Sequence, residues 1–189
     1  MVVAEINGAA PAAGTIISMC CDARVATAGS VLGLNESAFG LVAPFFAVDM
    51  AKSLMGSRAA YRAIGVGTLF RGEAAAAAGL VDVVSRRRWE ECGAINPDFK
   101  EANNPVSVPP GDVAAAVRAD AVAECEMWLA APGRAGAKRR FREDMLQRWS
   151  TGRVQDKERF VESLLDPVTQ HRLGDYLTSL SAGKQNKIK

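Results

Sequence analysis

The stretch from residue 6 to residue 44 constrains the fold of this chain most, because a strand, a tight turn and a helix must follow one another at its start. Val2 to Ile6 forms a short run of strand-forming residues, and Asn7-Gly8 closes it with a turn signal. The small residues Pro11-Ala12-Ala13-Gly14 then lead into apolar side chains spaced three to four apart, which predicts a helix over 11–20. A turn of small side chains at a helix N-terminus leaves backbone N–H groups free to bind negative charge.

The same stretch contains a lone carboxylate, Glu36, with apolar residues on both sides. Leu34 precedes it and Phe39 follows it. Burial among such side chains raises the pKa of a carboxyl group toward neutrality, which makes Glu36 a candidate proton carrier. Backbone donors for a developing negative charge, together with one base, suggest abstraction of a proton next to a carbonyl group.

The composition is typical of a globular domain. Hydrophobic residues make up 49% of the chain and charged residues 23%. No apolar run approaches the roughly 20 residues that span a bilayer, and the net charge of +2 is too small to indicate nucleic-acid binding. Basic residues cluster at Arg86-Arg87-Arg88 and at Lys138-Arg139-Arg140. Each run is either a solvated face or a contact for a phosphorylated ligand or an anionic surface.

The cysteines and the single histidine indicate no metal site. Cys20, Cys21, Cys92 and Cys125 show no Cys-x-x-Cys spacing, and neighbouring cysteines do not usually pair with each other. This pattern favours a reducing compartment over a secreted disulfide scaffold. His171 is expected on a helix surface. With one histidine, a metal site would need cysteine or carboxylate ligands at a suitable spacing, and the sequence shows none, so we predict no metal ligands.

Strands and helices alternate as far as Ser85, which favours an α/β fold with part of its sheet parallel. Further strands are expected over 22–27, 31–34 and 80–85, and short helices over 37–41, 49–56, 57–65 and 73–78. The hydrophobic first strand should have sheet neighbours on both sides. Because few strand-like runs follow Ser85, the chain looks as though it begins within a domain.

The remaining residues predict a linker and then helices. Four prolines lie between Trp89 and Pro110, and amphipathic helices are expected over 112–131, from Pro132 through Trp149, over 156–165 and over 167–180. The predicted organisation is a partial core at 1–88, a loop or linker at 89–111, a helical region at 112–181 and a disordered tail at 182–189. Another subunit is a candidate partner for the apolar helix faces.

Four motifs occur in an order that resembles the crotonase (enoyl-CoA hydratase/isomerase) superfamily, and within it the mitochondrial 3,2-trans-enoyl-CoA isomerases. They are ING with PAAG at 6–14, CDARVA at 21–26, GLNES through FGLVAPF at 33–45, and FRGEAAAAAGLVDVV at 70–84. The resemblance implies a crotonase-like (ClpP/crotonase) spiral core of ββα units, N-terminally truncated, with a C-terminal helical trimerisation region.

The resemblance also implies an activity. Such an enzyme shifts the double bond of a 3-enoyl-CoA to give the 2-trans-enoyl-CoA in the β-oxidation of unsaturated fatty acids. The expected substrate is a fatty enoyl-CoA, which carries its own CoA, so no cofactor is expected. A homotrimer without a membrane span is expected in the mitochondrial matrix, with a peroxisome-type compartment as the alternative.

Three positions match residues to which the family gives a role. The backbone N–H of Ala13 stands where the family places one of two oxyanion donors, although glycine is usual there. Glu36 matches the base that moves a proton between C2 and C4 of the acyl chain. Asn35 matches a position that contacts the substrate.

A fourth position separates two reactions of the superfamily. Ile16 stands where hydratases carry a second glutamate that helps to activate water, so the resemblance favours isomerisation over hydration. Ile16, Phe45 and Phe46 are candidate walls of the acyl pocket, or plain core residues.

Three functions therefore remain open. In the family, the first oxyanion N–H and much of the CoA-binding surface come from a segment before the ING strand. The first function is that of an enoyl-CoA isomerase. The second is that of a non-catalytic crotonase-like oligomer subunit or truncated pseudoenzyme, which binds partners through its C-terminal helices. An enoyl-CoA hydratase is the third reading, and Ile16 disfavours it.

Overall fold

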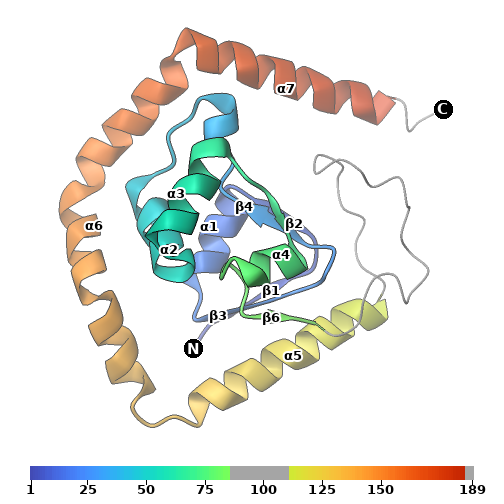
Figure 1. The fold of residues 1–189 in the computed structure, drawn as a ribbon, viewed down its shortest axis with the longest axis vertical. Helices are drawn as coiled ribbons and strands as arrows, with labels where there is room; N and C mark the ends of the chain where they lie inside the picture. Colours follow the sequence, from blue (N-terminus) through green and yellow to red (C-terminus); the bar gives the residue numbers. More distant parts are fainter. Residues whose placement is uncertain (86–110, 186–189) are drawn as a thin grey trace.

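The computed structural model describes residues 1–85 and 111–185, and two small sheets lie at its centre (Figure 1). The first sheet has the order β1-β3-β6 and is parallel throughout. It consists of β1 (Val3–Ile6), β3 (Ala23–Ala26) and β6 (Val83–Val84). All four residues of β3 are buried, as expected for the central strand of a covered parallel sheet.

The second sheet has the order β2-β4-β5. β2 (Ala9–Pro11) runs parallel to β4 (Val31–Gly33), and β5 (Phe70–Arg71) is antiparallel to β4. The α/β fold with a partly parallel sheet is thus confirmed.

Five short helices connect these strands and close the core. Met19, Leu32, Met50, Leu80 and several alanines form one cluster of buried side chains between them. The helices are α1 (Ala13–Cys20), the 3₁₀ helix η1 (Glu36–Phe39), α2 (Phe45–Met55), α3 (Ser57–Val66) and α4 (Gly72–Ala77).

Two predicted helix starts were wrong. The helix expected from Pro11 begins at Ala13, because Pro11 belongs to β2 and Ala12 has a non-helical φ of 49°. The helix expected from Asp49 begins at Phe45, directly after Pro44. Proline has a φ that suits the start of a helix, and the apolar residues that follow it pack against the core.

β1 is an edge strand, which corrects the expectation of neighbours on both sides. Among the described residues it pairs with β3 alone, and only Ile6 of its four residues is fully buried. Helix α5 (Gly111–Leu129) covers the sheet instead. Val117 of α5 packs there with Val3 and Val25 in a second cluster of apolar side chains.

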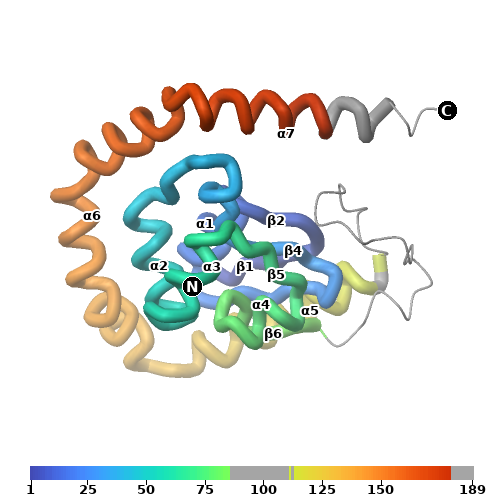
Figure 2. The backbone as a smooth tube through the Cα atoms, turned by 45° about the horizontal axis from the view of Figure 1, so that its top comes forward, coloured from blue at the N-terminus to red at the C-terminus, as the bar shows by residue number. Residues whose placement is uncertain are grey.

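The C-terminal helices run around the core rather than through it (Figures 1 and 2). The core lies between three helices, which follow one another around three of its sides: α5, α6 (Arg134–Leu165) and α7 (Pro167–Gln185). α6 is one helix where two were predicted. Its Gly152 lies against the ring of Phe45, so a residue without a side chain allows the helix to pass the core without a break.

The predicted tail was also wrong in part. α7 continues to Gln185, so residues 182–185 are helical. Alanine, lysine and glutamine in this segment favour helix, although Gly183 does not. Residues 86–110 and 186–189 lie outside the described residues, and with them most of the predicted linker, the run Arg86-Arg87-Arg88 and Cys92.

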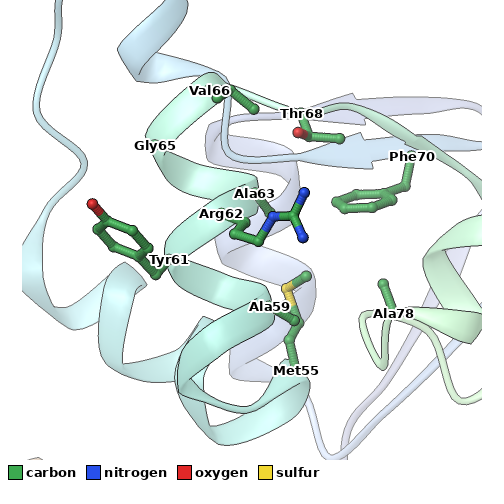
Figure 3. A pocket seen from close by; sticks show the side chains of 10 residues that line it. All are labelled: Met55, Ala59, Tyr61, Arg62, Ala63, Gly65, Val66, Thr68, Phe70 and Ala78. Carbon is green, nitrogen blue, oxygen red and sulfur yellow. The ribbon is translucent and has the colours of Figure 1, made fainter.

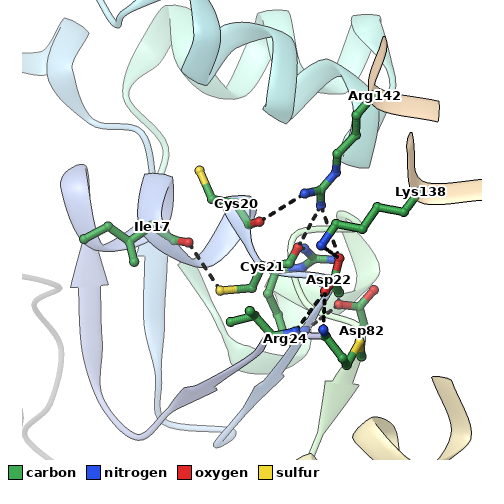
Figure 4. Close-up of polar contacts among 10 residues, drawn as sticks. Ile17, Cys20, Cys21, Asp22, Arg24, Asp82, Lys138 and Arg142 are labelled. Atoms are coloured by element: carbon green, nitrogen blue, oxygen red, sulfur yellow. Dashed lines mark hydrogen bonds and ion pairs between the residues drawn. The ribbon is translucent and has the colours of Figure 1, made fainter. Parts of the chain in front are cut away.

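Polar contacts attach α6 to the core. Asp49 of α2 accepts a hydrogen bond from the indole Nε1 of Trp149 (3.2 Å) and pairs with Arg148 (2.5 Å). Asp22, before β3, pairs with Lys138 (2.6 Å) and lies 3.8 Å from Arg142, and Figure 4 shows both cations reaching it from α6.

In the described part of the chain, no helix combines the length and the hydrophobicity needed to cross a membrane.

Candidate active site

The small residues before α1 form the predicted turn at the start of a helix. Ala12 adopts a positive φ of 49°, its N–H donates to the carbonyl of Gly33 (2.8 Å), and its own carbonyl accepts from Ile16 (3.0 Å). Ala13 follows as the first residue of α1 and is exposed. The N–H groups in the first turn of a helix have no partner within the helix, so the Ala13 N–H is available to an anion.

Glu36 is a buried carboxylate, with only 8% of the residue exposed. It is the first residue of η1, and its Oε2 has no hydrogen-bond partner among the described residues. Burial raises the pKa of Glu36, and a hydrogen bond from its own backbone N–H opposes this only in part. A carboxylate in this state binds a proton more readily than an exposed one, as a general base requires.

Gly33 connects these two features. It ends β4 three residues before Glu36, and both of its backbone polar groups bond to residues at the start of α1. Its φ is +149°, and a Cβ atom at this position would lie 2.2 Å from the carbonyl oxygen of Thr68. Only glycine fits here without a shift of the backbone.

A second anchor holds η1 from the other side. The hydroxyl of Ser37 donates to the carbonyl of Ile64, 2.5 Å away near the end of α3.

A cavity of about 580 Å³ lies along α3 and β5, lined by Arg62, Thr68 and Phe70 among others (Figure 3). The predicted site residues are not among those that line it.

Four of the predicted site residues lie on two segments that Gly33 joins through hydrogen bonds. Ala13 and Ile16 lie in the first turn of α1, and Asn35 and Glu36 follow the glycine that is bonded to that turn. Ile16 is half-buried and packs against the core cluster. The carbonyl of Asn35 accepts from the Ala38 N–H (3.1 Å), and its side chain makes no capping hydrogen bond to η1.

Phe45 lies elsewhere, against α6. Its N–H donates to Asp156 (3.0 Å), and its ring contacts Phe46 and the position of Gly152. Phe45, Phe46 and Trp149 line a cavity of about 430 Å³ between α2 and α6.

Sequence reasoning missed Thr15. This threonine is completely buried, and its hydroxyl bonds to both Ala10 and Gly33. The available signal was a hydroxyl between Gly14 and Ile16 at the start of a mostly apolar helix.

The other residues singled out in the sequence lie outside this site. His171 is exposed on α7, as predicted, with its Nε2 3.5 Å from Asp175. Of the basic run at 138–140, Lys138 pairs with Asp22 and Arg140 with Glu143. Within 1–85 and 111–185 no group of three or more His, Cys, Asp or Glu residues could hold a metal ion, and the described cysteines are free thiols.

Comparisons with known proteins identify the family of this fold. Residues 1–91 match the family "Enoyl-CoA hydratase/isomerase". The crystal structure of human mitochondrial delta3-delta2-enoyl-CoA isomerase superposes with a TM-score of 0.76 at 30% identity, covering 96% of this chain and 62% of that one. The chain belongs to the crotonase superfamily.

Curated relatives of this crotonase from Homo sapiens and Mus musculus are named "Enoyl-CoA delta isomerase 1, mitochondrial". The protein from Homo sapiens is 30% identical over 188 residues, which cover 97% of this chain and 53% of the relative. The protein from Mus musculus is 45% identical over 86 residues, 44% of this chain and 30% of the relative. This crotonase therefore spans about half the length of the human relative. An enoyl-CoA hydratase from Mycobacterium avium subsp. paratuberculosis, 17% identical with a TM-score of 0.68, shows the same fold.

Proposed function

We propose that this crotonase is an enoyl-CoA isomerase, which converts a 3-enoyl-CoA into the conjugated 2-trans-enoyl-CoA. One observation carries the proposal: the buried carboxylate of Glu36, whose Oε2 has no hydrogen-bond partner among the described residues, lies on the segment bonded through Gly33 to the α1 turn. The isomerase names of the relatives support the same reaction.

The reaction needs one base and one site for negative charge. Glu36 removes a proton from C2 of the thioester, and the electrons of that C–H bond delocalise onto the thioester oxygen as a dienolate. The Ala13 N–H donates a hydrogen bond to this oxygen, and loss of one such donor typically costs about 10²–10³ in rate. Protonated Glu36 then returns its proton to C4, which leaves the double bond between C2 and C3 and regenerates the carboxylate.

The environment of Glu36 favours isomerisation over hydration. Ile16, in the same turn as Ala13, has no group that could activate water. A half-buried Asn35 beside Glu36 is proposed to contact the substrate. Phe45 is proposed as a wall for the acyl chain, because the cavity that it lines with Phe46 and Trp149 is largely apolar.

The assembly and compartment are part of the same proposal. Apolar side chains on α6 and α7, including Phe141, Val154, Leu165 and Val168, are more than half exposed, which supports a homotrimer built through these helices. We place the enzyme in the β-oxidation of unsaturated fatty acids in the mitochondrial matrix, because its relatives are named mitochondrial; their names do not support a peroxisome-type compartment. The substrate carries the CoA, and no further cofactor is proposed.

A direct assay tests the proposed reaction. The purified protein is mixed with a 3-enoyl-CoA, and the conjugated product is followed by its ultraviolet absorbance; crotonyl-CoA is tested in parallel for water addition. We expect conjugation without hydration. Hydration of crotonyl-CoA would instead identify a hydratase.

The exposed apolar faces of α6 and α7 favour one second candidate, a non-catalytic crotonase-like subunit. Absence of both reactions in a protein that is folded by circular dichroism would support it. A monomer in light scattering at micromolar concentration would count against it.

A further inference from the structure

The Thr15 hydroxyl occupies an unusual place between two strands. Thr15 is the third residue of α1, and none of its surface is exposed. The hydroxyl donates to the carbonyl of Ala10 in β2 (2.6 Å) and accepts from the N–H of Gly33 in β4 (2.7 Å). A hydroxyl has one proton to donate, so the bond to Ala10 uses it and the bond from Gly33 uses a lone pair.

The strand register shows which position of the ladder this hydroxyl contacts. Gly33 is paired with Pro11, so in a regular parallel ladder its N–H would bond directly to the residue before Pro11, which is Ala10. The Thr15 hydroxyl contacts both of these groups and so links the two strands through a side chain as well. The Ala12 N–H bonds to the Gly33 carbonyl at the next position of the ladder (2.8 Å).

We infer that Thr15 is a positioning residue for the isomerase reaction, an inference that rests on the proposed function. Its side chain connects the strand that leads to Glu36 with the strand that leads to the Ala13 turn, and its backbone belongs to that turn. The hydroxyl thereby fixes the distance between the oxyanion donor and the base. It does not touch the substrate.

Removal of the hydroxyl should therefore reduce turnover more than binding. Thr15→Val keeps the shape of the side chain and removes one hydrogen bond from each of the Ala10 carbonyl and the Gly33 N–H. Because a misplacement of about 1 Å can cost about 10²-fold in rate, we expect kcat to fall by about 10- to 100-fold with KM changed by less than about threefold. Thr15→Ser keeps the hydroxyl and should recover kcat to within about threefold of the parent.

A second buried threonine provides the matched control. Thr27 is also completely buried, and its hydroxyl bonds to Ser30 Oγ (2.8 Å) in the turn before β4, at the opposite end of that strand from Gly33. Thr27→Val removes a buried hydroxyl of the same kind and should lower the melting temperature while kcat stays within about twofold.

The outcomes separate the two proposals. An inactive parent protein would overturn the isomerase function and the role of Thr15 with it. An active parent, with Thr15→Val and Thr27→Val equal in kcat, would overturn the role of Thr15 alone. If Thr15→Val does not fold, the pair Thr15→Ser and Thr15→Ala makes the same comparison, because these variants differ by one hydroxyl. Unfolding of Thr15→Ala as well would assign the hydroxyl to stability and overturn the inference.

Discussion

The core and helix α6 are held in place by different interactions. In the core, Met19, Val25 and Leu32 are completely buried, and apolar packing fixes the strands. The 32 residues of α6 include none that is fully buried. Its contacts with the core combine polar contacts to Asp22 and Asp49 with the half-buried Met145 and Trp149, which pack against the core cluster. Complete burial therefore fixes the backbone of the core, whereas a few half-buried side chains and polar contacts hold α6 against its surface.

Carboxylates show the same contrast. Glu36 in the core has a buried oxygen atom without a partner among the described residues. Asp22 and Asp49 at the α6 contact each have a cation within 2.6 Å. An unpaired buried carboxylate costs stability, so its presence in the core is better explained by a chemical role than by folding.

The largest effect is expected for Gly33→Ala in the core. The added Cβ would lie 2.2 Å from the Thr68 carbonyl oxygen, and the φ of +149° disfavours any side chain. Urea unfolding should show a loss of about 3 kcal/mol or more. Wild-type stability in this variant would show that the close packing of β4 against Thr68 is wrong.

A smaller, local effect is expected for Asp49→Ala at the α6 contact. This change removes the acceptor of Trp149 and the partner of Arg148. Amides of α6 near Trp149 should exchange about fivefold faster, which corresponds to the roughly 1 kcal/mol of one net hydrogen bond. Amides of β3 should be unaffected, and Asp144→Ala on the exposed side of α6 is the control. Equal acceleration in β3 would mean that α6 and the core unfold as one unit.

The pH dependence of stability should have opposite signs in the two regions. Burial works to raise the pKa of Asp22, but the hydrogen bonds from Lys138 and the Val2 N–H and the nearby charges of Lys138 and Arg142 outweigh it and lower the pKa. Its contribution is therefore present above the unfolded value of about 3.9 and lost as the pH falls through the lower folded pKa.

Glu36 has a raised pKa, so its folded form holds the proton more tightly and stability falls as the pH rises above about 4.3 toward the folded pKa. Thermal unfolding between about pH 3 and pH 7 measures both effects. Glu36→Gln should remove the loss of stability that accompanies rising pH, and Asp22→Asn should remove the loss of stability that accompanies falling pH. Parallel curves for the two variants would contradict the assignment of the two environments.

The smallest effect is expected for Gly136→Ala in α6. No atom lies within 4 Å of the position that the new Cβ would occupy. Alanine favours helix over glycine by up to about 1 kcal/mol, so far-UV circular dichroism during urea unfolding should show a slight gain in stability. Destabilisation would indicate that this face of α6 is already covered in solution.

Local patterns in the sequence were enough to predict the centre of the site. The small residues before α1 predicted the helix N-terminus, and the apolar neighbours of Glu36 predicted a buried carboxylate with a raised pKa, because both depend on residues adjacent in the chain. The alternation of strands and helices predicted the α/β core for the same reason.

Contacts between distant residues could not be predicted in this way. The continuity of α6 depends on the Phe45 ring against Gly152, and the role of Thr15 depends on a strand that begins sixteen residues later, at Val31. The edge position of β1 is a property of the sheet as a whole. Each of these features is a tertiary contact without a local signature.

The most direct test of the central claim compares the parent protein with Glu36→Gln in the 3-enoyl-CoA isomerase assay. Glutamine keeps the size of the side chain but cannot take up the proton. We predict a fall in kcat of about 10²–10⁴-fold with the fold intact, whereas Glu73→Gln, on the exposed surface of α4, should be as active as the parent. A Glu36→Gln variant with the parent's kcat would show that another group moves the proton.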